Sequence, residues 1–139
     1  MNEVKVDHIG IATKSIKDSS LIWEILGFTE SEEELIADQG VKVKIYSADE
    51  GTKIELLEPL GEETPIAKFI KKRGPGIQQL AISVSDINKT IHNLKRMGIK
   101  LINEVPTKGA SGNLIAFIHP SSAGGILIEL VEEINNNQK

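Results

Sequence analysis

Four polar side chains stand where the surrounding sequence is rich in Val, Ile and Leu: His8, Glu55, Gln79 and Glu129. A carboxylate inside an apolar strand is costly to bury unless it is paired or binds a cation. Imidazole together with oxygen donors suits a divalent ion such as Co, Ni, Mn, Fe or Zn. We therefore interpret the four residues as candidate metal ligands, which would leave two octahedral positions open for substrate oxygens.

The spacing of these residues indicates a repeat. Gln79 lies 71 positions after His8, and Glu129 lies 74 positions after Glu55. A single loop insertion accounts for the difference. One strand glutamate usually faces solvent and one strand histidine is usually not a ligand, but matched positions in two repeats are hard to explain by chance. If the two halves pack about a pseudo-twofold axis, the four side chains converge.

The elements that must position these residues recur in the same order in both halves. The first half predicts a strand at Val4–Thr13, a helix at Ser15–Leu26, and strands at Phe28–Ile36, Val41–Ser47 and Lys53–Glu58. The second half predicts a strand at Gly76–Ser85, a helix at Asp86–Met97, and strands at Ile99–Glu104, Leu114–His119 and Gly125–Glu132. Ser85 is the expected N-cap of the second helix, and Gly98 is its expected stop. The predicted fold class is α+β, with two tandem βαβββ modules.

A short helix links the modules. Thr64 is a suitable N-cap, and Pro65 suits the first helical position. We expect module one over about residues 4–60, the linker helix over about 64–73 and module two over about 76–133, all within a single domain of 139 residues.

The composition argues against several classes of function. Hydrophobic residues make up 40% of the chain but aromatics only 4%, so Ile, Leu and Val must form the core. The net charge of −4 and the pI near 5.4 argue against a nucleic-acid partner, because phosphate binding needs a basic surface. The lack of cysteine rules out a thiolate metal site. The sequence has neither a signal peptide nor an apolar run long enough to cross a membrane, so we expect a cytoplasmic protein with no membrane partner.

Several segments resemble a known family. Asp7–Ala12 is similar to the opening of the vicinal-oxygen-chelate superfamily, the glyoxalase and bleomycin resistance proteins. Five further segments resemble the methylmalonyl-CoA epimerases more narrowly: Glu55–Gly61, Thr64–Ile70, Lys108–Gly112, Ile115–Pro120 and Gly124–Glu132. The resemblance extends over nearly the whole chain.

The resemblance implies a fold and a metal site. Paired βαβββ modules would form a curved mixed sheet around a central metal cleft, usually in a homodimer. The family's metal positions map onto His8, Glu55, Gln79 and Glu129, with Co, Ni, Mn or Zn as the ion. Epimerases usually carry two consecutive histidines where this chain has Gln78 and Gln79, and the second of them is a ligand. Glutamine can still ligate through its carbonyl oxygen, as a weaker and neutral donor.

The implied reaction interconverts (R)- and (S)-methylmalonyl-CoA by proton transfer at C2 through an enolate, so the implied partner is a small acyl-CoA. Inversion needs an acid/base group on each face of that carbon. By resemblance, Glu129 is the first choice for one such group. The position where some family members place a second glutamate is Val43 here, which leaves Glu55 as the fallback.

Two other functions fit the same residues. A glyoxalase I-like lactoylglutathione lyase would use the same ligands and the same proton-transfer logic, although the linker and the segment Gly109–Gly112 favour the epimerase. Alternatively, the loss of a histidine at Gln79 could mark a non-catalytic superfamily member that binds a small ligand.

Overall fold

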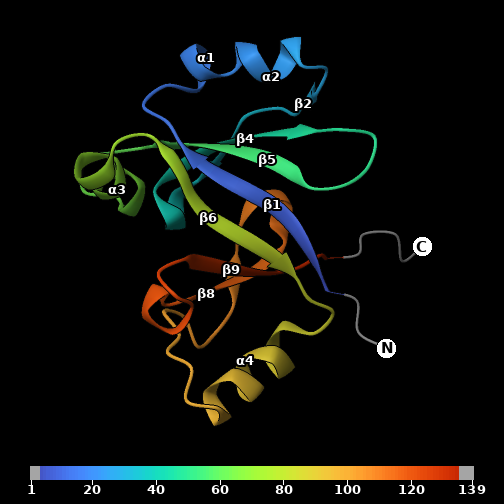
Figure 1. The fold of residues 1–139 in the computed structure, drawn as a ribbon, viewed down its shortest axis with the longest axis vertical. Coiled ribbons are helices and arrows are strands. Elements are labelled where there is room, and N and C mark those ends of the chain that lie inside the picture. The colour runs from blue at the N-terminus through green and yellow to red at the C-terminus, as the bar shows by residue number, and fades with distance from the viewer. Residues whose placement is uncertain (1–3, 135–139) are drawn as a thin grey trace. The chain divides into compact units, whose positions relative to one another are not determined.

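The computed structural model describes residues 4–134 of the chain (Figure 1). These residues form two compact units, one of residues 8–78 and one of residues 79–134 together with residues 4–7. Within the described range, no helix has the length and apolar character needed to cross a lipid bilayer.

The first module is a mixed sheet with short helices. Its strands are β1 (Lys5–Ala12), β2 (Thr29–Glu30), β3 (Glu34–Ile36), β4 (Val41–Ser47) and β5 (Lys53–Pro59). Its helical segments are α1 (Ile16–Ser19), α2 (Leu21–Ile25), a 3-10 turn (Ala37–Gln39) and the linker helix α3 (Pro65–Arg73). The strands lie in the order β2, β4, β5, β1, and β3 also pairs with β4. β1 runs parallel to β5, whereas β4 runs antiparallel to it. As predicted, Thr64 caps α3 and Pro65 begins it.

The second module repeats this plan. Its strands are β6 (Gly76–Ser83), β7 (Thr107–Lys108), β8 (Leu114–Ile118) and β9 (Leu127–Glu132). Its helical segments are α4 (Ile87–Arg96) and 3-10 turns at Ala110–Gly112 and Pro120–Ser122. The strands lie in the order β6, β9, β8, β7, with β6 parallel to β9 and β8 antiparallel to β9.

The backbone pairing of the two modules is equivalent position by position. Gly10 is opposite Glu55 in the β1–β5 pair, and Ala81 is opposite Glu129 in the β6–β9 pair. These pairs differ by the same offsets that relate the candidate ligands in the sequence. The predicted repeat is therefore confirmed in the register of the strands that carry them.

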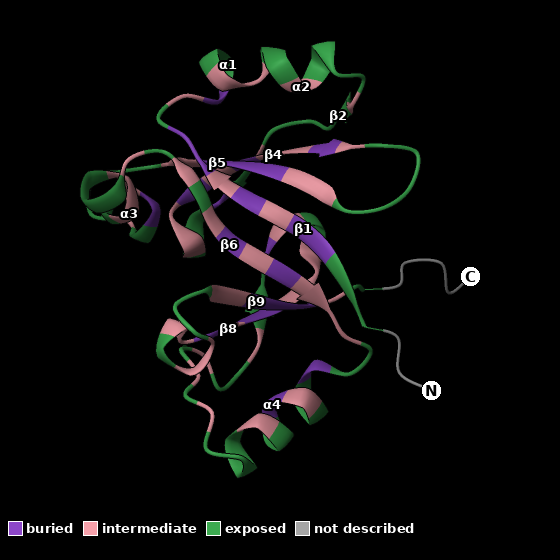
Figure 2. Ribbon diagram, viewed as in Figure 1, coloured by how far each residue is buried: buried purple, intermediate pink, exposed green. Residues whose placement is uncertain are grey.

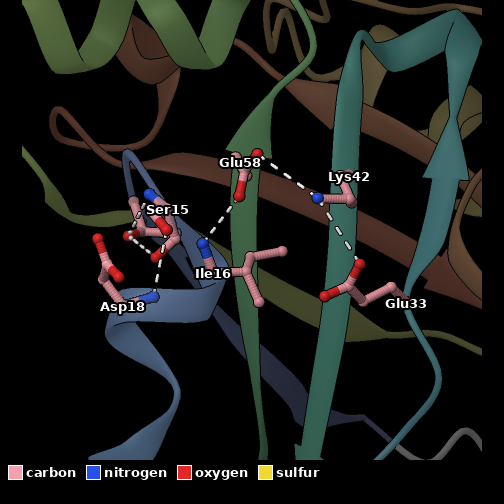
Figure 3. A network of polar contacts seen from close by, with 7 residues as sticks. Ser15, Ile16, Asp18, Glu33, Lys42 and Glu58 are labelled. Atoms are coloured by element: carbon pink, nitrogen blue, oxygen red, sulfur yellow. Dashed lines mark hydrogen bonds and ion pairs between the residues drawn. The ribbon is translucent and has the colours of Figure 1, made fainter.

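A glutamate near the end of each module's last strand caps the first helix of that module. The Ile16 amide donates to Glu58 Oε1 at 2.8 Å, and the Ile87 amide donates to Glu132 Oε1 at 2.9 Å. Glu58 also faces Lys42, whose Nζ lies 3.6 Å from Glu58 Oε2 (Figure 3). Charged acceptors at these places satisfy amides that a helix start leaves without an intrahelical partner. The repeat thus extends to the side chains that join helix to sheet.

Each sheet buries one apolar face against helices, and buried bands alternate along the strands (Figure 2). In the first module this core contains Ile16, Tyr46 and Leu56. In the second it contains Ile87, Ile91, Ala116, Ile118 and Leu130. Because successive strand side chains point to opposite faces, Glu55 and Glu129 lie on the faces turned away from these helices.

The first predicted helix is wrong in extent, since the structure divides Ser15–Leu26 into α1 and α2. Ser20 lies between the two helices, and its hydroxyl donates to the backbone oxygen of Lys17 at 3.3 Å. Serine hydroxyls that bond nearby backbone groups compete with a continuous helix. The predicted apolar stripe is therefore not one buried face. Ile16 is buried, whereas the exposed fractions are 61% for Leu21, 53% for Ile22, 69% for Ile25 and 62% for Leu26.

The predicted strand at Ile99–Glu104 is also wrong. Leu101 makes only an isolated bridge with Ile118, and β7 pairs with β8 instead. The Asn103 side chain accepts the Phe117 amide at 2.9 Å, so a side chain takes the place of a backbone ladder bond. The segment therefore follows β8 without forming a regular strand.

Two smaller corrections concern element ends. The predicted strand Phe28–Ile36 divides into β2 and β3, because the Ser31 hydroxyl accepts the Ile45 amide of β4 at 2.9 Å in place of a backbone oxygen. Asp86 rather than Ser85 caps α4, with its carboxylate accepting the Lys89 amide at 3.0 Å. Asp86 thereby matches Ser15, the N-cap of α1, at the repeat offset of 71.

Candidate metal and acid/base site

The four predicted ligands are all buried. Their exposed fractions are 3% for His8, 6% for Glu55, 7% for Gln79 and 6% for Glu129. In the described part of the chain, only Asp7 and Thr13 are other buried polar or charged residues. Burial at this level distinguishes the four from ordinary strand residues that face solvent.

The first module brings His8 and Glu55 together. His8 lies on β1 and Glu55 lies on the neighbouring parallel strand β5. His8 Nδ1 lies 3.3 Å from Glu55 Oε2. A carboxylate beside an imidazole nitrogen fixes the orientation of the ring.

The second module brings Gln79 and Glu129 together in the same way. The Gln79 amide nitrogen donates to Glu129 Oε1 at 2.6 Å. The structure therefore brings two of the four candidate ligands together within each module. The convergence of both pairs on one ion stays a prediction.

Apolar side chains surround each pair on its sheet face. In the first module Val43 and Leu57 are opposite each other in register, and both are buried. In the second module the neighbours are Ala81, Ile115 and Val131, with Phe117 packed against them. Surroundings of low polarity strengthen interactions between charges and penalise an unpaired one.

The donor chemistry of the pairs fits a divalent ion. Two ligands at about 2.1 Å from an ion and at right angles are about 3 Å apart. The separation of 3.3 Å between His8 Nδ1 and Glu55 Oε2 is close to that spacing. In the second pair a half-turn of the Gln79 amide would bring its ligating oxygen to the side of Glu129. Over the described residues, no group of three or more His, Cys, Asp or Glu side chains suited to an ion is found, so the fit rests on the two pairs.

The helix-facing side of the first module carries a separate charge cluster. Lys44 forms an ion pair with Glu30 and lies over the Tyr46 ring, with 5.8 Å between Nζ and the ring centre. The hydrogen bond to Glu30 raises the pKa of Lys44 above its ordinary value of 10.5, although burial acts in the opposite direction. Lys42 similarly lies 3.6 Å from Glu33 Oε1 (Figure 3). These charges stabilise the sheet and lie on the face away from the candidate ligands.

Sequence reasoning missed two charged residues on the ligand-bearing face. Lys53 is opposite His8 in the β1–β5 register, and Glu34 is opposite Val43 in the β3–β4 register. Both side chains are half-buried. The face on which Glu34 lies depends on pairing between β3 and β4, and the expected continuous strand Phe28–Ile36 gave no sign of it.

Comparisons with known proteins identify relatives over most of the chain. A model of the Glyoxalase/Bleomycin resistance protein/Dioxygenase superfamily matches residues 7–117. The mitochondrial methylmalonyl-CoA epimerase of Dictyostelium discoideum is 34% identical over 131 residues, which are 93% of this chain and 78% of that relative.

Solved structures give the same picture. The methylmalonyl-CoA epimerase of Mycobacterium tuberculosis has a TM-score of 0.90 and 40% identity, covering 94% of this chain and 89% of its own. A methylmalonyl-CoA epimerase in complex with methylmalonyl-CoA and NH4+ has a TM-score of 0.88 and 28% identity, covering 94% of each chain. The predicted resemblance and fold class, the vicinal-oxygen-chelate fold, are thereby confirmed.

Proposed function

Because the chain belongs to the glyoxalase/bleomycin resistance protein/dioxygenase superfamily, we propose that it is a methylmalonyl-CoA epimerase, an isomerase that interconverts (R)- and (S)-methylmalonyl-CoA. One observation carries this function. A buried His–Glu pair and a buried Gln–Glu pair occupy equivalent positions of a chain that is similar to epimerases over 93% of its length. The substrate is a small acyl-CoA, as in the relative solved with methylmalonyl-CoA.

The reaction requires stabilisation of an enolate and proton transfer on both faces of C2. C2 lies between a carboxylate and a thioester, so removal of its proton leaves an enolate that must be stabilised. The proton must then return on the opposite face, which requires a second acid/base group. We propose that Glu129 serves one face, since it is a buried carboxylate whose Oε1 accepts a hydrogen bond from the Gln79 side-chain amide. Glu55 is the other carboxylate that the sequence suggested.

We propose that His8, Glu55, Gln79 and Glu129 hold one divalent ion, with Co, Ni, Mn and Zn as the candidates. The support is the burial of all four side chains and the donor spacing within each pair. When bound, such an ion supplies Lewis-acid stabilisation of the enolate charge. The protein's own contribution is to hold the two carboxylates in apolar surroundings, where their charge has the strongest effect.

The test is C2 deuterium exchange and inversion of methylmalonyl-CoA in D2O, followed by mass spectrometry and chiral analysis. We expect both exchange and inversion, with about one equivalent of divalent metal in the purified protein. Formation of a lactoyl thioester from methylglyoxal and glutathione without exchange would favour the lyase instead. Metal-free protein that catalyses neither reaction would favour a module that only binds its ligand.

Replacing Glu129 by glutamine gives a sharper result. Removal of one acid/base group should lower inversion by about 10²- to 10⁴-fold. Exchange should survive from the enantiomer whose proton is removed by the group on the other face. Loss of inversion with exchange retained from one enantiomer would assign Glu129 as a proton-transfer group and not merely a ligand. Near-normal inversion would remove Glu129 from the mechanism.

We further propose that the protein is a cytoplasmic homodimer built from one domain per chain. The exposed apolar side chains of α2, Leu21, Ile22 and Ile25, are the kind of surface that a second copy could cover. Light scattering on the eluting protein tests the dimer, because a monomer mass at micromolar concentration would contradict it.

A further inference from the structure

The remaining acid/base group has to come from the titratable side chains on the ligand-bearing faces. In the first module, strand alternation and register place His8, Lys53, Glu55 and Glu34 on that face. In the second module, Glu129 is the one titratable side chain that the described strands place on the equivalent face. Glu34 is therefore the one carboxylate on either face that is not a candidate metal ligand.

We propose that Glu34 is the second acid/base group, acting on the face of C2 that Glu129 does not serve. This inference rests on the proposed epimerase function and adds a residue to it. Glu55 is the weaker choice, because its Oε2 lies 3.3 Å from His8, with which it forms the first candidate ligand pair. Glu34 is half-buried, so its carboxylate can exchange protons with solvent between turnovers.

Register places Glu34 within reach of the site. Glu34 is directly opposite Val43 on β4, and Val43 is directly opposite Leu57 on β5, two residues from Glu55. Adjacent strands are about 4.8 Å apart and residues two positions apart on a strand are about 6.7 Å apart, so Glu34 and Glu55 are separated by roughly 12 Å of sheet. A glutamate side chain and a bound acyl group together span such a distance.

The repeat explains why the two acid/base groups need not be equivalent residues. Thr107 is opposite Ile115 in the β7–β8 pair, as Glu34 is opposite Val43 in the β3–β4 pair. The position of Glu34 thus carries no titratable group in the second module. Each module would then supply one proton-transfer carboxylate, Glu34 from the first and Glu129 from the second.

The proposed step conserves protons and electrons. A carboxylate on one face takes the C2 proton, and the C–H electron pair passes into the enolate and onto the thioester oxygen. The carboxylic acid on the other face returns a proton to C2, and the electron pair reforms the C–H bond. One turnover exchanges the protonation states of Glu34 and Glu129, and solvent resets them. No oxidant, reductant or further reactant is needed.

The experiment compares Glu34→Gln with Glu33→Gln, the neighbouring glutamate that pairs with Lys42 at 3.6 Å. Inversion by Glu34→Gln should fall at least about 100-fold, while exchange persists from one enantiomer. That enantiomer should be the one whose exchange is lost in Glu129→Gln. Glu33→Gln should invert within about twofold of the wild type. The double variant Glu34→Gln with Val43→Glu, which moves the carboxylate to the facing strand, should recover part of the inversion.

Different results separate the possible failures. Inversion by Glu34→Gln within about threefold of the wild type, at unchanged thermal stability, overturns the role of Glu34 and leaves the epimerase function standing. If Glu55→Gln, and not Glu34→Gln, shows exchange from one enantiomer only, the role of Glu34 is likewise overturned and the epimerase function stands. Wild-type protein that neither exchanges nor inverts methylmalonyl-CoA overturns the proposed function, and this inference with it.

Discussion

The glutamates that cap the two helix starts make a quantitative prediction. Glu58→Ala removes the acceptor of the Ile16 amide, and Glu132→Ala removes the acceptor of the Ile87 amide. Ile16 is 1% exposed and Ile87 is 0% exposed, so water has little access to replace the lost acceptor. A buried donor left without a partner costs about 1–3 kcal/mol. We expect Glu132→Ala to lower the free energy of unfolding by about 1.5 kcal/mol within that range.

Glu58→Ala should cost more, because Glu58 also lies 3.6 Å from Lys42. Both side chains of this ion pair are about three-quarters covered, and such a partly exposed pair adds only about 0.5 kcal/mol. The total of about 2 kcal/mol corresponds to a fall of roughly 6 °C in Tm for a chain of 139 residues. Glu58→Gln keeps an oxygen acceptor, so it should lose about half as much.

Urea unfolding followed by circular dichroism measures these differences, and the epimerisation assay accompanies it. Because Glu58 and Glu132 point away from the ligand-bearing faces, both variants should invert substrate within about threefold of the wild type when measured well below Tm. Losses below about 0.5 kcal/mol in both alanine variants would show that the two helix starts do not depend on these carboxylates. A loss of activity as large as that of Glu129→Gln would contradict the separation of the two faces.

Two further predictions concern charge and metal affinity. Lys44→Met should lower the free energy of unfolding at neutral pH by about 0.5 kcal/mol, because it removes an exposed ion pair with Glu30. The ion pair raises the pKa of Lys44 above 10.5, so its stabilisation is complete below pH 10.5 and is lost as the pH rises through the folded-state pKa. The difference in unfolding free energy between wild type and variant should therefore disappear in urea unfolding at alkaline pH. A gap that stays constant with pH would assign the effect to packing on Tyr46. Gln79→His should raise the affinity for Zn2+ or Co2+ by on the order of tenfold, because imidazole is a stronger donor than an amide oxygen. Competition with a chromophoric chelator measures this affinity. An unchanged affinity would place Gln79 outside the ligand set.

The candidate ligands could be predicted from the sequence because they break a local rule at repeated positions. His8 and Glu55 interrupt apolar runs, and the same interruption recurs at matching offsets in the second half. Strand alternation is a local property, so it also predicts correctly which strand residues share a face. Both pairs accordingly lie within contact distance in the structure.

The errors of prediction arise where side chains compete with the backbone for hydrogen bonds. The helix expected at Ser15–Leu26 satisfies a helical apolar pattern, yet the serine hydroxyls at its centre favour a break and α2 leaves its apolar side chains exposed. The strand expected at Ile99–Glu104 loses its ladder to the Asn103 side chain, which bonds the Phe117 amide. Neither outcome can be read from propensity alone, because a side chain competes for a backbone group: the Ser20 hydroxyl for the nearby Lys17 oxygen, and the Asn103 oxygen for the more distant Phe117 amide.

Glu34 shows the same limit for function. In the sequence it is one of three consecutive glutamates, a run that ordinarily indicates a solvated surface. Only the pairing of β3 with β4 separates it from its neighbours, by placing it opposite buried Val43 while Glu33 turns to Lys42. In a duplicated fold, a residue present in only one module makes the two modules chemically different. Inversion needs a proton donor on one face of the enolate and a proton acceptor on the other. A carboxylate added on β3 of one module alone supplies that second group without disturbing either ligand pair.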